Sequence, residues 1–456
     1  MDMPKIGKLI LRLKEIVGEE NILNDPDKLK TFAIDGKKPK VVLSPGTINE
    51  VSKIVSYAGE QNLSIFPMGN GSKMGIGGIP KKADILLHTT RLNRITDCDC
   101  DNLTLSAECG ITLDEVQKRL AQEGKGYFLP LDPSFTEKAT LGGIVATNSS
   151  GPRRLLYGTA RDLIIGTKAV FPNGDIVVSG GKTVKNVSGY DMCKLLIGSY
   201  GTLGFLFEIT FKLLPLPEKA ATLLFPYATL EGAVQFGQDI LRSQYLPSSI
   251  EILNGSAVKR IKSLAGQQGD YLVAIGLEGV AESIDRQVSE MGERAGKKGA
   301  LGTTVLQSEA HSSFWKTIRD FPKGLVDEGL QFISFKSNML ISRCGEVMGH
   351  YEKIVKDSSL DCALVCHSGN GVLYSYILTG KNVRSKKESL LGLIKEFSSV
   401  AAQNEGDLVV ETSSSDIKKR IDVWGEPKSD YEIMRRLKQE IDPKGIFNPG
   451  RFVGGI

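Results

Sequence analysis

The sequence predicts an α+β protein built from two or three domains. Its 456 residues are about three times the usual length of one domain. Between residues 45 and 217 the chain is rich in glycine and in short runs of β-forming residues. From residue 218 to about residue 425, long helical patterns alternate with strand candidates, an order typical of helices packed on an antiparallel sheet.

The spacing of apolar residues predicts the individual elements. In the first part, a helix is expected over 49–61, capped by Thr47, and strands are expected at 64–66, 84–88, 103–107 and 204–211. In the second part, helices are expected at 230–244, 280–298 and 386–403, and strands at 249–253, 271–277, 331–335, 362–366 and 373–378. A basic helix from residue 431 leads into a turn-rich tail at 442–450.

The composition excludes several classes of protein. A chain that is 41% hydrophobic and 24% charged is neither disordered nor a multi-span membrane protein, and no apolar stretch reaches the roughly 20 residues that a bilayer requires. A net charge of +4 is too small to indicate a nucleic acid partner. Seven scattered cysteines, with no ligand spacing, favour reduced thiols. We therefore expect a cytoplasmic protein that reaches a membrane only through a partner.

The segment 66–78 is the first of three glycine-rich stretches. It holds five glycines within about ten residues, and such a backbone can present N–H groups to phosphate oxygens. The segment lacks the ending of a Walker A loop and is not a strict G-x-G-x-x-G motif. It is therefore either a phosphate-binding loop or a plain glycine loop.

Two further stretches follow in the same part of the chain. Asp132-Pro133 precedes the small residues of 140–151, which let either a flat ligand or a neighbouring strand approach the backbone closely. The third stretch combines 185–191 with 197–204. Several glycine loops in one domain favour an extended cofactor, and tight turns between strands are the alternative.

In this order, the three stretches resemble the FAD-binding domain of the vanillyl-alcohol oxidase and p-cresol methylhydroxylase type. The tail from Asp442 to Phe452 is similar to the ending of the glycolate oxidase and D-lactate dehydrogenase branch. The resemblance implies a two-subdomain FAD-binding domain at 1–217 and an α+β cap domain with an antiparallel sheet at 218–430. It also implies that a C-terminal segment, 431–456, returns to the FAD domain.

The resemblance also assigns cofactor contacts. The loop that begins at Pro67 would hold the FAD pyrophosphate through the backbone N–H groups of Gly69, Asn70 and Gly71 and the Ser72 hydroxyl. The ring and ribityl parts would be lined by Pro133, Thr140, Gly142, Gly143, Ala146 and Ser149. The adenine side would be lined by Gly201, Gly204 and Ile209, and the tail would return to the flavin through Asn448. Because the loop contains no His, we expect non-covalent FAD.

The chain departs from the branch where the metal ligands are expected. The pattern His-x-Gly-Asp-Gly-Asn-x-His is here His367-Ser-Gly-Asn370-Gly-Val372-Leu-Tyr374, and Glu411-Thr-Ser stands where a later Glu-His-Gly is expected. One His without a partner cannot form a tight divalent site, so no metal is expected. Three further segments, 151–154, 184–191 and 423–425, look more like the companion flavin subunit of bacterial glycolate oxidase, which lacks the metal histidines. This likeness implies an iron–sulfur protein or a second flavoprotein as partner.

The catalytic candidates follow from the chemistry of a small 2-hydroxy acid. His367 is a candidate base, or else a packing histidine. Arg343 is a candidate clamp for the substrate carboxylate, or else a surface charge, with Arg153 and Arg154 as alternatives. The first hypothesis is an FAD-dependent dehydrogenase subunit for glycolate- or D-lactate-like acids. The alternatives are a non-catalytic electron-transfer subunit and a sugar or aldonolactone oxidase of the same fold.

Overall fold

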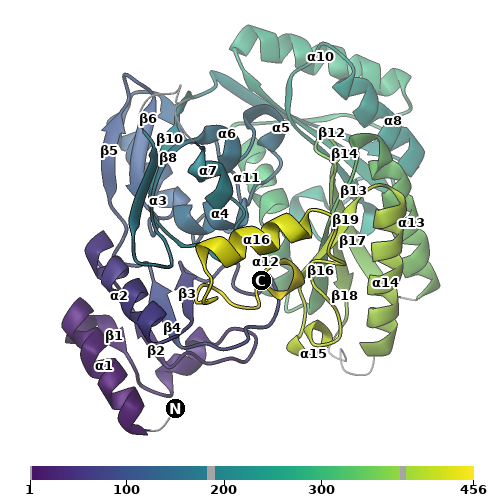
Figure 1. Ribbon diagram of the computed structural model, residues 1–456. Coiled ribbons are helices and arrows are strands. Elements are labelled where there is room, and N and C mark those ends of the chain that lie inside the picture. The colour runs from purple at the N-terminus through teal and green to yellow at the C-terminus, as the bar shows by residue number, and fades with distance from the viewer. Residues whose placement is uncertain (1–2, 182–189, 359, 381–386) are drawn as a thin grey trace. The chain divides into compact units, whose positions relative to one another are not determined.

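The computed structural model describes residues 3–181, 190–358, 360–380 and 387–456 (Figure 1). The chain divides into two compact units. Unit 1 consists of Met1–Ser150, Thr159–Pro215 and Ser414–Ile456, and unit 2 consists of Gly151–Gly158 and Leu216–Ser413. The units differ from the expected domains in two segments, because 151–158 belongs to unit 2 and 414–430 to unit 1. The short helix α5 (Arg154–Tyr157) packs against β13 (Pro247–Asn254) of unit 2, which explains the first exchange.

The first sheet of unit 1 is mostly parallel. Its four strands lie in the order β1 (Ile22–Leu23), β2 (Val41–Leu43), β4 (Ile85–His88) and β3 (Ile65–Met68), and only β1 is antiparallel to its neighbour. Helix α2 (Ile48–Glu60) joins β2 to β3 and buries its apolar face in the same core cluster as these strands. Thr47 accepts a hydrogen bond from the Glu50 backbone N, which confirms the predicted cap. Helix α1 (Met3–Val17) packs beside α2 (Figure 1).

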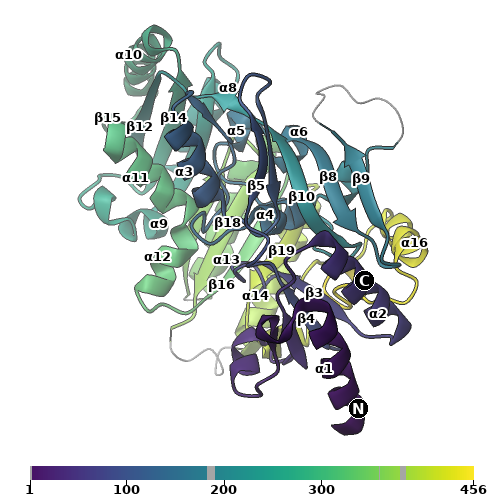
Figure 2. The same ribbon diagram turned by 90° about the vertical axis from the view of Figure 1, so that its left-hand side faces the viewer.

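The second sheet of unit 1 is antiparallel. Its strands lie in the order β5 (Ile95–Asp99), β6 (Thr104–Glu108), β10 (Phe205–Lys212), β8 (Ile164–Val170) and β9 (Ile176–Gly180), and Figure 2 shows β10, β8 and β9 side by side. The central strand β10 is buried along its length except at Lys212, because it is paired on both edges and covered by helices. Those helices are α3 (Leu113–Glu123), α4 (Leu141–Thr147), α6 (Ala160–Leu163) and α7 (Met192–Leu196). A two-stranded ribbon pairs β7 (Tyr127–Phe128) with β11 (Leu214–Pro215).

The C-terminal segment of unit 1 comprises α15 (Ser415–Lys418), α16 (Tyr431–Ile441) and the turn-rich tail. Lys438 and Asp442 form a buried ion pair with 2.6 Å between Nζ and Oδ2. The Asp442 carboxylate also accepts hydrogen bonds from the backbone N of Ile446 and of Phe447. Backbone hydrogen bonds on both sides of Phe447 then join the tail to Ile65 of β3. This fixed turn explains why the tail is ordered against the first sheet.

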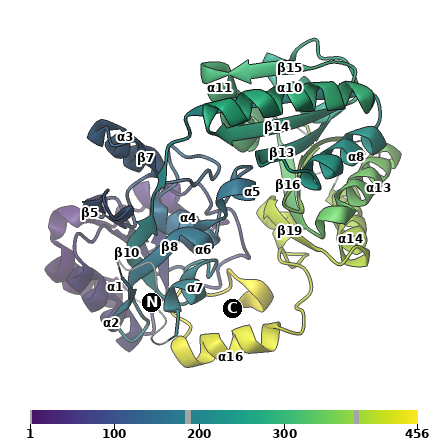
Figure 3. The ribbon, with the colours of Figure 1, turned by 90° about the horizontal axis from the view of Figure 1, so that it is seen from above.

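Unit 2 is built on one antiparallel sheet of eight strands. The strand order is β15 (Thr304–Gln307), β12 (Lys219–Tyr227), β14 (Tyr271–Gly279), β13, β17 (Asp361–His367), β18 (Val372–Leu378), β16 (Phe332–Asn338) and β19 (Asp407–Thr412). Helices α8 (Leu230–Leu241), α13 (Cys344–Asp357) and α14 (Lys387–Gln403) lie in succession on one side (Figures 1 and 3). Helices α9 (Gly255–Lys259), α11 (Ser308–Arg319) and α12 (Phe321–Asp327) form another group (Figure 2), and α10 (Ala281–Lys297) packs on β12 and β14.

The structure confirms the predicted α+β class. The expected helices at 49–61, 230–244, 280–298 and 386–403 correspond to α2, α8, α10 and α14, with ends that differ by a few residues. Helices α11 and α13 were not expected, although their buried residues recur at helical spacing. Part of the third glycine stretch, 185–189, lies outside the described residues. No helix in the described ranges combines the length and the apolar character needed to span a bilayer.

The buried Lys438–Asp442 pair supports a stability prediction. We expect Asp442→Ala to lower the free energy of unfolding by about 3 kcal/mol or more, because it leaves a buried ammonium without its carboxylate. The matched control is Glu432→Ala in the same C-terminal segment, whose exposed pairs with Arg435 and Arg436 should contribute little to stability. Urea unfolding followed by circular dichroism measures both. Equal losses in the two variants would contradict the assigned role of Asp442.

Candidate functional site

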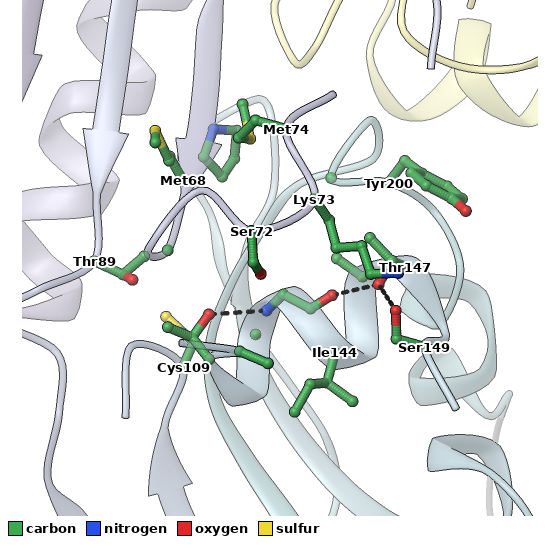
Figure 4. A pocket seen from close by; sticks show the side chains of 18 of the residues that line it. Met68, Ser72, Lys73, Met74, Thr89, Cys109, Ile144, Thr147, Ser149 and Tyr200 are labelled. Atoms are coloured by element: carbon green, nitrogen blue, oxygen red, sulfur yellow. Dashed lines mark hydrogen bonds between the residues drawn. The ribbon is translucent and has the colours of Figure 1, made fainter. Parts of the chain in front are cut away.

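A cavity of about 1010 Å³, open to solvent, lies within unit 1. Its walls come from the loop after β3, from the turn that leads into α4 together with α4 itself, and from the segment before β10. Figure 4 shows side chains from these segments directed into one space, among them Met68, Ser72 and Ile144. Three stretches that are far apart in the sequence therefore share one concave surface.

The cavity brings together nearly all the residues that the sequence analysis assigned to a cofactor. The predicted residues that line it are Pro67, Gly69, Asn70, Gly71, Ser72, Pro133, Thr140, Gly142, Gly143, Ala146, Ser149, Gly201, Gly204 and Asn448. Ile209 is not among the lining residues. It lies in the middle of β10, paired with Ala107 and Thr167, and its side chain is fully buried in the core of the antiparallel sheet. A side chain in that position supports the sheet, and the assignment of Ile209 to the adenine side stays a prediction.

The glycine loop after β3 approaches α4 very closely. A Cβ atom on Gly69 would lie 2.3 Å from Thr140 Oγ1, and Gly71 has a φ of +75°. Only glycine fits the first position without displacing the helix N-cap, and only glycine adopts the second conformation without strain. The Thr140 hydroxyl is itself fixed, because it accepts a hydrogen bond from the backbone N of Gly143 at 3.3 Å. The loop is therefore held at a defined position on the cavity wall.

The small residues of α4 serve packing as well as the cavity. A Cβ on Gly142 would lie 2.8 Å from the Cβ of Cys109, and the Gly142 backbone N donates to the Cys109 carbonyl at 2.8 Å. Figure 4 shows the hydrogen bonds that follow along this helix, from Thr147 Oγ1 to the Gly143 carbonyl and between Thr147 and Ser149. The sequence left two interpretations open for this stretch, close packing or the approach of a flat ligand. Helix α4 packs closely on its neighbours and also lines the cavity, so the two are compatible.

Two buried polar atoms in the cavity wall point to a polar ligand. Thr89 Oγ1 and Asn448 Oδ1 are buried and have no hydrogen-bond partner within the described part of the chain. The other end of the Asn448 amide is fixed, because Nδ2 donates to the Tyr200 carbonyl at 2.7 Å. A buried oxygen without a partner costs free energy, so a ligand that donates hydrogen bonds here would be bound favourably.

The remaining lining suits a molecule with a flat ring system and an anionic part. Met68, Met74, Ile144 and Leu206 supply apolar surface. Lys73 supplies a cation, and in Figure 4 its side chain extends toward Thr147. Such a combination of apolar walls and few polar groups is typical of cofactor sites. The residues present therefore fit FAD, the cofactor implied by the glycine stretches.

Cys109 also lines the cavity and was missed by the sequence analysis. Its side chain is fully buried, and burial, with a smaller contribution from the neighbouring Glu108, raises the pKa of the thiol well above its usual value. A thiol that stays protonated is a poor nucleophile. Thr89, Lys73 and Arg451 also line the cavity and were not assigned from the sequence. Lys73 lies in the first glycine-rich stretch, and Arg451 directly follows Pro449-Gly450 in the tail, so their positions could have indicated a contact.

In unit 2, the candidate base His367 ends β17 and is buried. Its Nδ1 lies 2.5 Å from Glu251 Oε2 on the neighbouring strand β13, and Glu251 is itself fully buried. The Tyr374 ring lies 5.2 Å from the imidazole in an edge-on arrangement. The carboxylate orients the ring and leaves Nε2 as the nitrogen that does not face Glu251.

The candidate arginines of unit 2 all have carboxylate partners or packed surroundings. Arg343 lies at the end of the 3-10 helix η4 (Ile341–Arg343), is exposed, and pairs with Glu346 at 2.8 Å. Arg153 binds Glu278 through Nε and Nη2, and Tyr157 also donates to Glu278. Burial opposes ionisation of Glu278, but Arg153 and Tyr157 outweigh it, so the pKa of Glu278 lies below its ordinary value. Neither arrangement identifies the carboxylate clamp.

Segment 367–374, in which the sequence departs from the expected metal ligands, is not part of a metal-binding cluster among the described residues. Across the ranges that the structure describes, no group of three His, Cys, Asp or Glu side chains is placed to hold a metal ion. Tyr374, at the position of the second expected His, packs against His367.

Comparisons with known proteins agree with the cavity. Residues 39–180 match the family described as "FAD binding domain", and residues 216–452 match "FAD linked oxidases, C-terminal domain". The chain is 29% identical to the Bacillus subtilis protein named glycolate oxidase subunit GlcD, over 96% of this chain and 95% of that protein. It is 28% identical to a D-lactate dehydrogenase of Archaeoglobus fulgidus, over 91% of each chain. A solved structure of p-cresol methylhydroxylase superposes with a TM-score of 0.77 at 15% identity, covering 99% of this chain and 97% of that one.

The close approach at Gly69 supports a prediction on cofactor binding. We expect Gly69→Ala to weaken FAD binding at least about tenfold, because the new methyl group must displace Thr140 and with it the loop. Titration of apoprotein with FAD, followed by flavin fluorescence, measures the dissociation constant. Gly75→Ala is the matched control, since a Cβ there meets nothing within 4 Å. Wild-type affinity in Gly69→Ala would contradict the assigned role of the loop.

Proposed function

The chain belongs to the FAD-linked oxidase family, and we propose that it is an FAD-dependent 2-hydroxy-acid dehydrogenase subunit that passes electrons to a protein partner. The substrate class is proposed from the relatives, because one is named a glycolate oxidase subunit and another a D-lactate dehydrogenase. Both names describe the oxidation of a hydroxyl group next to a carboxylate.

The unit 1 cavity is the observation that carries the proposal. It gathers the glycine loop, α4 and the tail around one space, and it contains two buried oxygens without partners. We propose that the backbone of 69–71 and the Ser72 hydroxyl bind the pyrophosphate of FAD. Pro133, Thr140, Gly142, Gly143, Ala146 and Ser149 would line its ring and ribityl parts, Gly201 and Gly204 its adenine side, and Asn448 would bind from the tail. The protonated thiol of Cys109 and the absence of His from the loop support non-covalent binding.

Oxidation of a 2-hydroxy acid removes two electrons and two protons and gives a 2-oxo acid. Bound FAD supplies the two-electron acceptor for this chemistry. The protein must hold the substrate carboxylate and receive the hydroxyl proton. We propose His367 Nε2 for the proton, because Glu251 fixes the ring through Nδ1 and can balance the charge of a protonated imidazole.

We propose Arg343 as the carboxylate clamp, although its pairing with Glu346 does not by itself identify that role. Its guanidinium is exposed and its known partner, Glu346, lies one helical turn away on the surface. An exposed ion pair of this kind contributes little to stability and exchanges readily, so a substrate carboxylate can replace Glu346 at small cost.

The second candidate function is an electron-transfer subunit that oxidises no acid itself. It is favoured by Tyr374 in place of a second His. The contact between His367 and Glu251 is compatible with it, because a core histidine can form the same contact. In both cases we propose an iron–sulfur protein or a second flavoprotein as the partner, since the Bacillus subtilis relative is named as a subunit.

Anaerobic mixing separates the two candidate functions. If the chain is the dehydrogenase, glycolate, D-lactate or a longer 2-hydroxy acid bleaches the flavin absorbance of the isolated holoprotein. L-Lactate serves as the stereochemical control, and dithionite confirms that the bound flavin is reducible. A flavin that dithionite bleaches but no 2-hydroxy acid does would contradict the dehydrogenase and favour the electron-transfer subunit.

Substitution of His367 tests its role as the base. We expect His367→Asn to slow flavin reduction by a factor of about 100 or more, while FAD affinity is unchanged. Stopped-flow absorbance measures the reduction rate, and the flavin content of the purified variant measures cofactor binding. His311→Asn is the control, because His311 is another buried histidine of unit 2, with Nδ1 2.8 Å from Thr222 Oγ1. Equal reduction rates in wild type and His367→Asn would exclude the assignment.

A further inference from the structure

Two buried cations lie behind the glycine loop, and neither belongs to the assigned cofactor contacts. Lys418 ends α15, and its side chain is 1% exposed; Arg451 follows in the tail with 6% exposure. Both bind Asp35, from the start of the chain. Lys418 Nζ lies 2.9 Å from Asp35 Oδ1, and Arg451 Nη1 lies 2.9 Å from Asp35 Oδ2. Two cations share one carboxylate, so one positive charge is left for other groups to offset.

Five consecutive backbone carbonyls provide that compensation. The carbonyl oxygens of 74–78 accept hydrogen bonds alternately from the two cations. Arg451 binds those of Met74, Ile76 and Gly78, with 2.6 Å from Nη2 to Met74 O and 2.6 Å from Nη1 to Gly78 O. Lys418 Nζ binds those of Gly75 and Gly77, the latter at 3.2 Å. We call residues 74–78 the carbonyl turn.

The carbonyl turn is joined directly to the cavity. Met74 and Ile76 line the cavity, as does Arg451. The backbone N of Met74 donates to the Gly71 carbonyl, and that of Ile76 donates to the Lys73 carbonyl. The position of the carbonyl turn therefore sets the position of residues 71–73, which form the part of the loop assigned to the pyrophosphate.

Two of the five glycines of the loop serve this contact and not a phosphate. A Cβ on Gly77 would lie 2.4 Å from the Arg451 carbonyl, and a Cβ on Gly78 would lie 2.4 Å from the Gly450 carbonyl. Gly78 N also donates to the Arg451 carbonyl at 3.1 Å. The second half of the glycine stretch is thus shaped to receive the tail, whereas the first half faces the cavity.

We propose that Lys418 and Arg451 are positioning residues for FAD: they hold the carbonyl turn and thereby fix residues 69–73 in the conformation that binds the cofactor. This inference rests on the proposed binding of FAD in the unit 1 cavity. Burial lowers the pKa of both side chains below the ordinary values, and Asp35 opposes part of that shift.

The test compares FAD affinity with fold stability. We expect Lys418→Met and Arg451→Met apoproteins to bind FAD at least about tenfold more weakly than wild type, because each removes charged hydrogen bonds to the turn. Arg451→Lys keeps the charge but loses the planar guanidinium group that reaches three carbonyls. We expect its FAD affinity to lie between those of wild type and Arg451→Met. Titration with FAD gives the dissociation constants, and thermal unfolding of the apoproteins gives their stability.

The matched control is Lys40→Met, since Lys40 pairs with the buried Asp84 in the same unit. It should lower thermal stability but leave the FAD dissociation constant within about twofold of wild type. Trypsin cleavage after Lys73 in the apoproteins provides a second measurement. It should be faster in Lys418→Met, Arg451→Met and Arg451→Lys than in wild type and Lys40→Met, because the substitutions at 418 and 451 free the loop.

Each outcome has a distinct meaning. Wild-type affinity and wild-type cleavage at Lys73 in folded Lys418→Met and Arg451→Met would overturn the inference. So would a loss of FAD affinity in Lys40→Met as large as in Lys418→Met, because the effect would then reflect stability alone. If Lys418→Met does not fold, Arg451→Lys decides. A wild-type apoprotein that takes up no FAD would instead overturn the proposed function.

Discussion

Unit 1 depends on the contact of Asp35, Lys418 and Arg451 with the carbonyl turn. These groups come from the start, the first third and the end of the sequence, and the hydrogen bonds join residues that are 383 and 416 positions apart. Burying two cations beside one carboxylate is costly unless further groups offset the charge, and here backbone carbonyls do so. Because Met74 and Ile76 of the carbonyl turn and Arg451 of the tail line the cavity, the tail is directly connected to the proposed cofactor site.

The glycines of unit 1 therefore have more than one physical role. Gly69 and Gly142 let α4 lie against the loop and against Cys109, whereas Gly77 and Gly78 let the tail lie against the loop. Gly201 has a φ of +64° and places the backbone beside the Asn448 amide. In each case the absence of a Cβ brings two backbone segments together, and the cavity is the space that remains between them. A glycine count alone does not separate contact with a ligand from contact with another segment.

The sequence predicted those features that local patterns record. Apolar spacing located α2, α8, α10 and α14. The family resemblance carried by the glycine stretches named many of the residues that line the cavity. Ile209, which the resemblance also named, lies in the sheet core and outside the cavity lining. Thr89 and Cys109 lie at strand ends without any motif. The pairing of Lys418 with Asp35 could not be predicted, because the sequence does not distinguish an exposed lysine from a buried one. The carbonyl groups that bind Lys418 come close to it only in the folded chain.

The buried pair of Glu251 and His367 bears on which function unit 2 serves. A fully buried carboxylate is expensive to keep, and a pair of hydrophobic side chains of similar volume would stabilise a sheet at least as well. Stability alone therefore does not explain why β13 and β17 carry this pair. The geometry would serve the proposed proton transfer, because the carboxylate holds Nδ1 and Nε2 does not face it. In that role the imidazole would act through its own proton and through the charge of Glu251. This physical argument favours the dehydrogenase over the electron-transfer subunit.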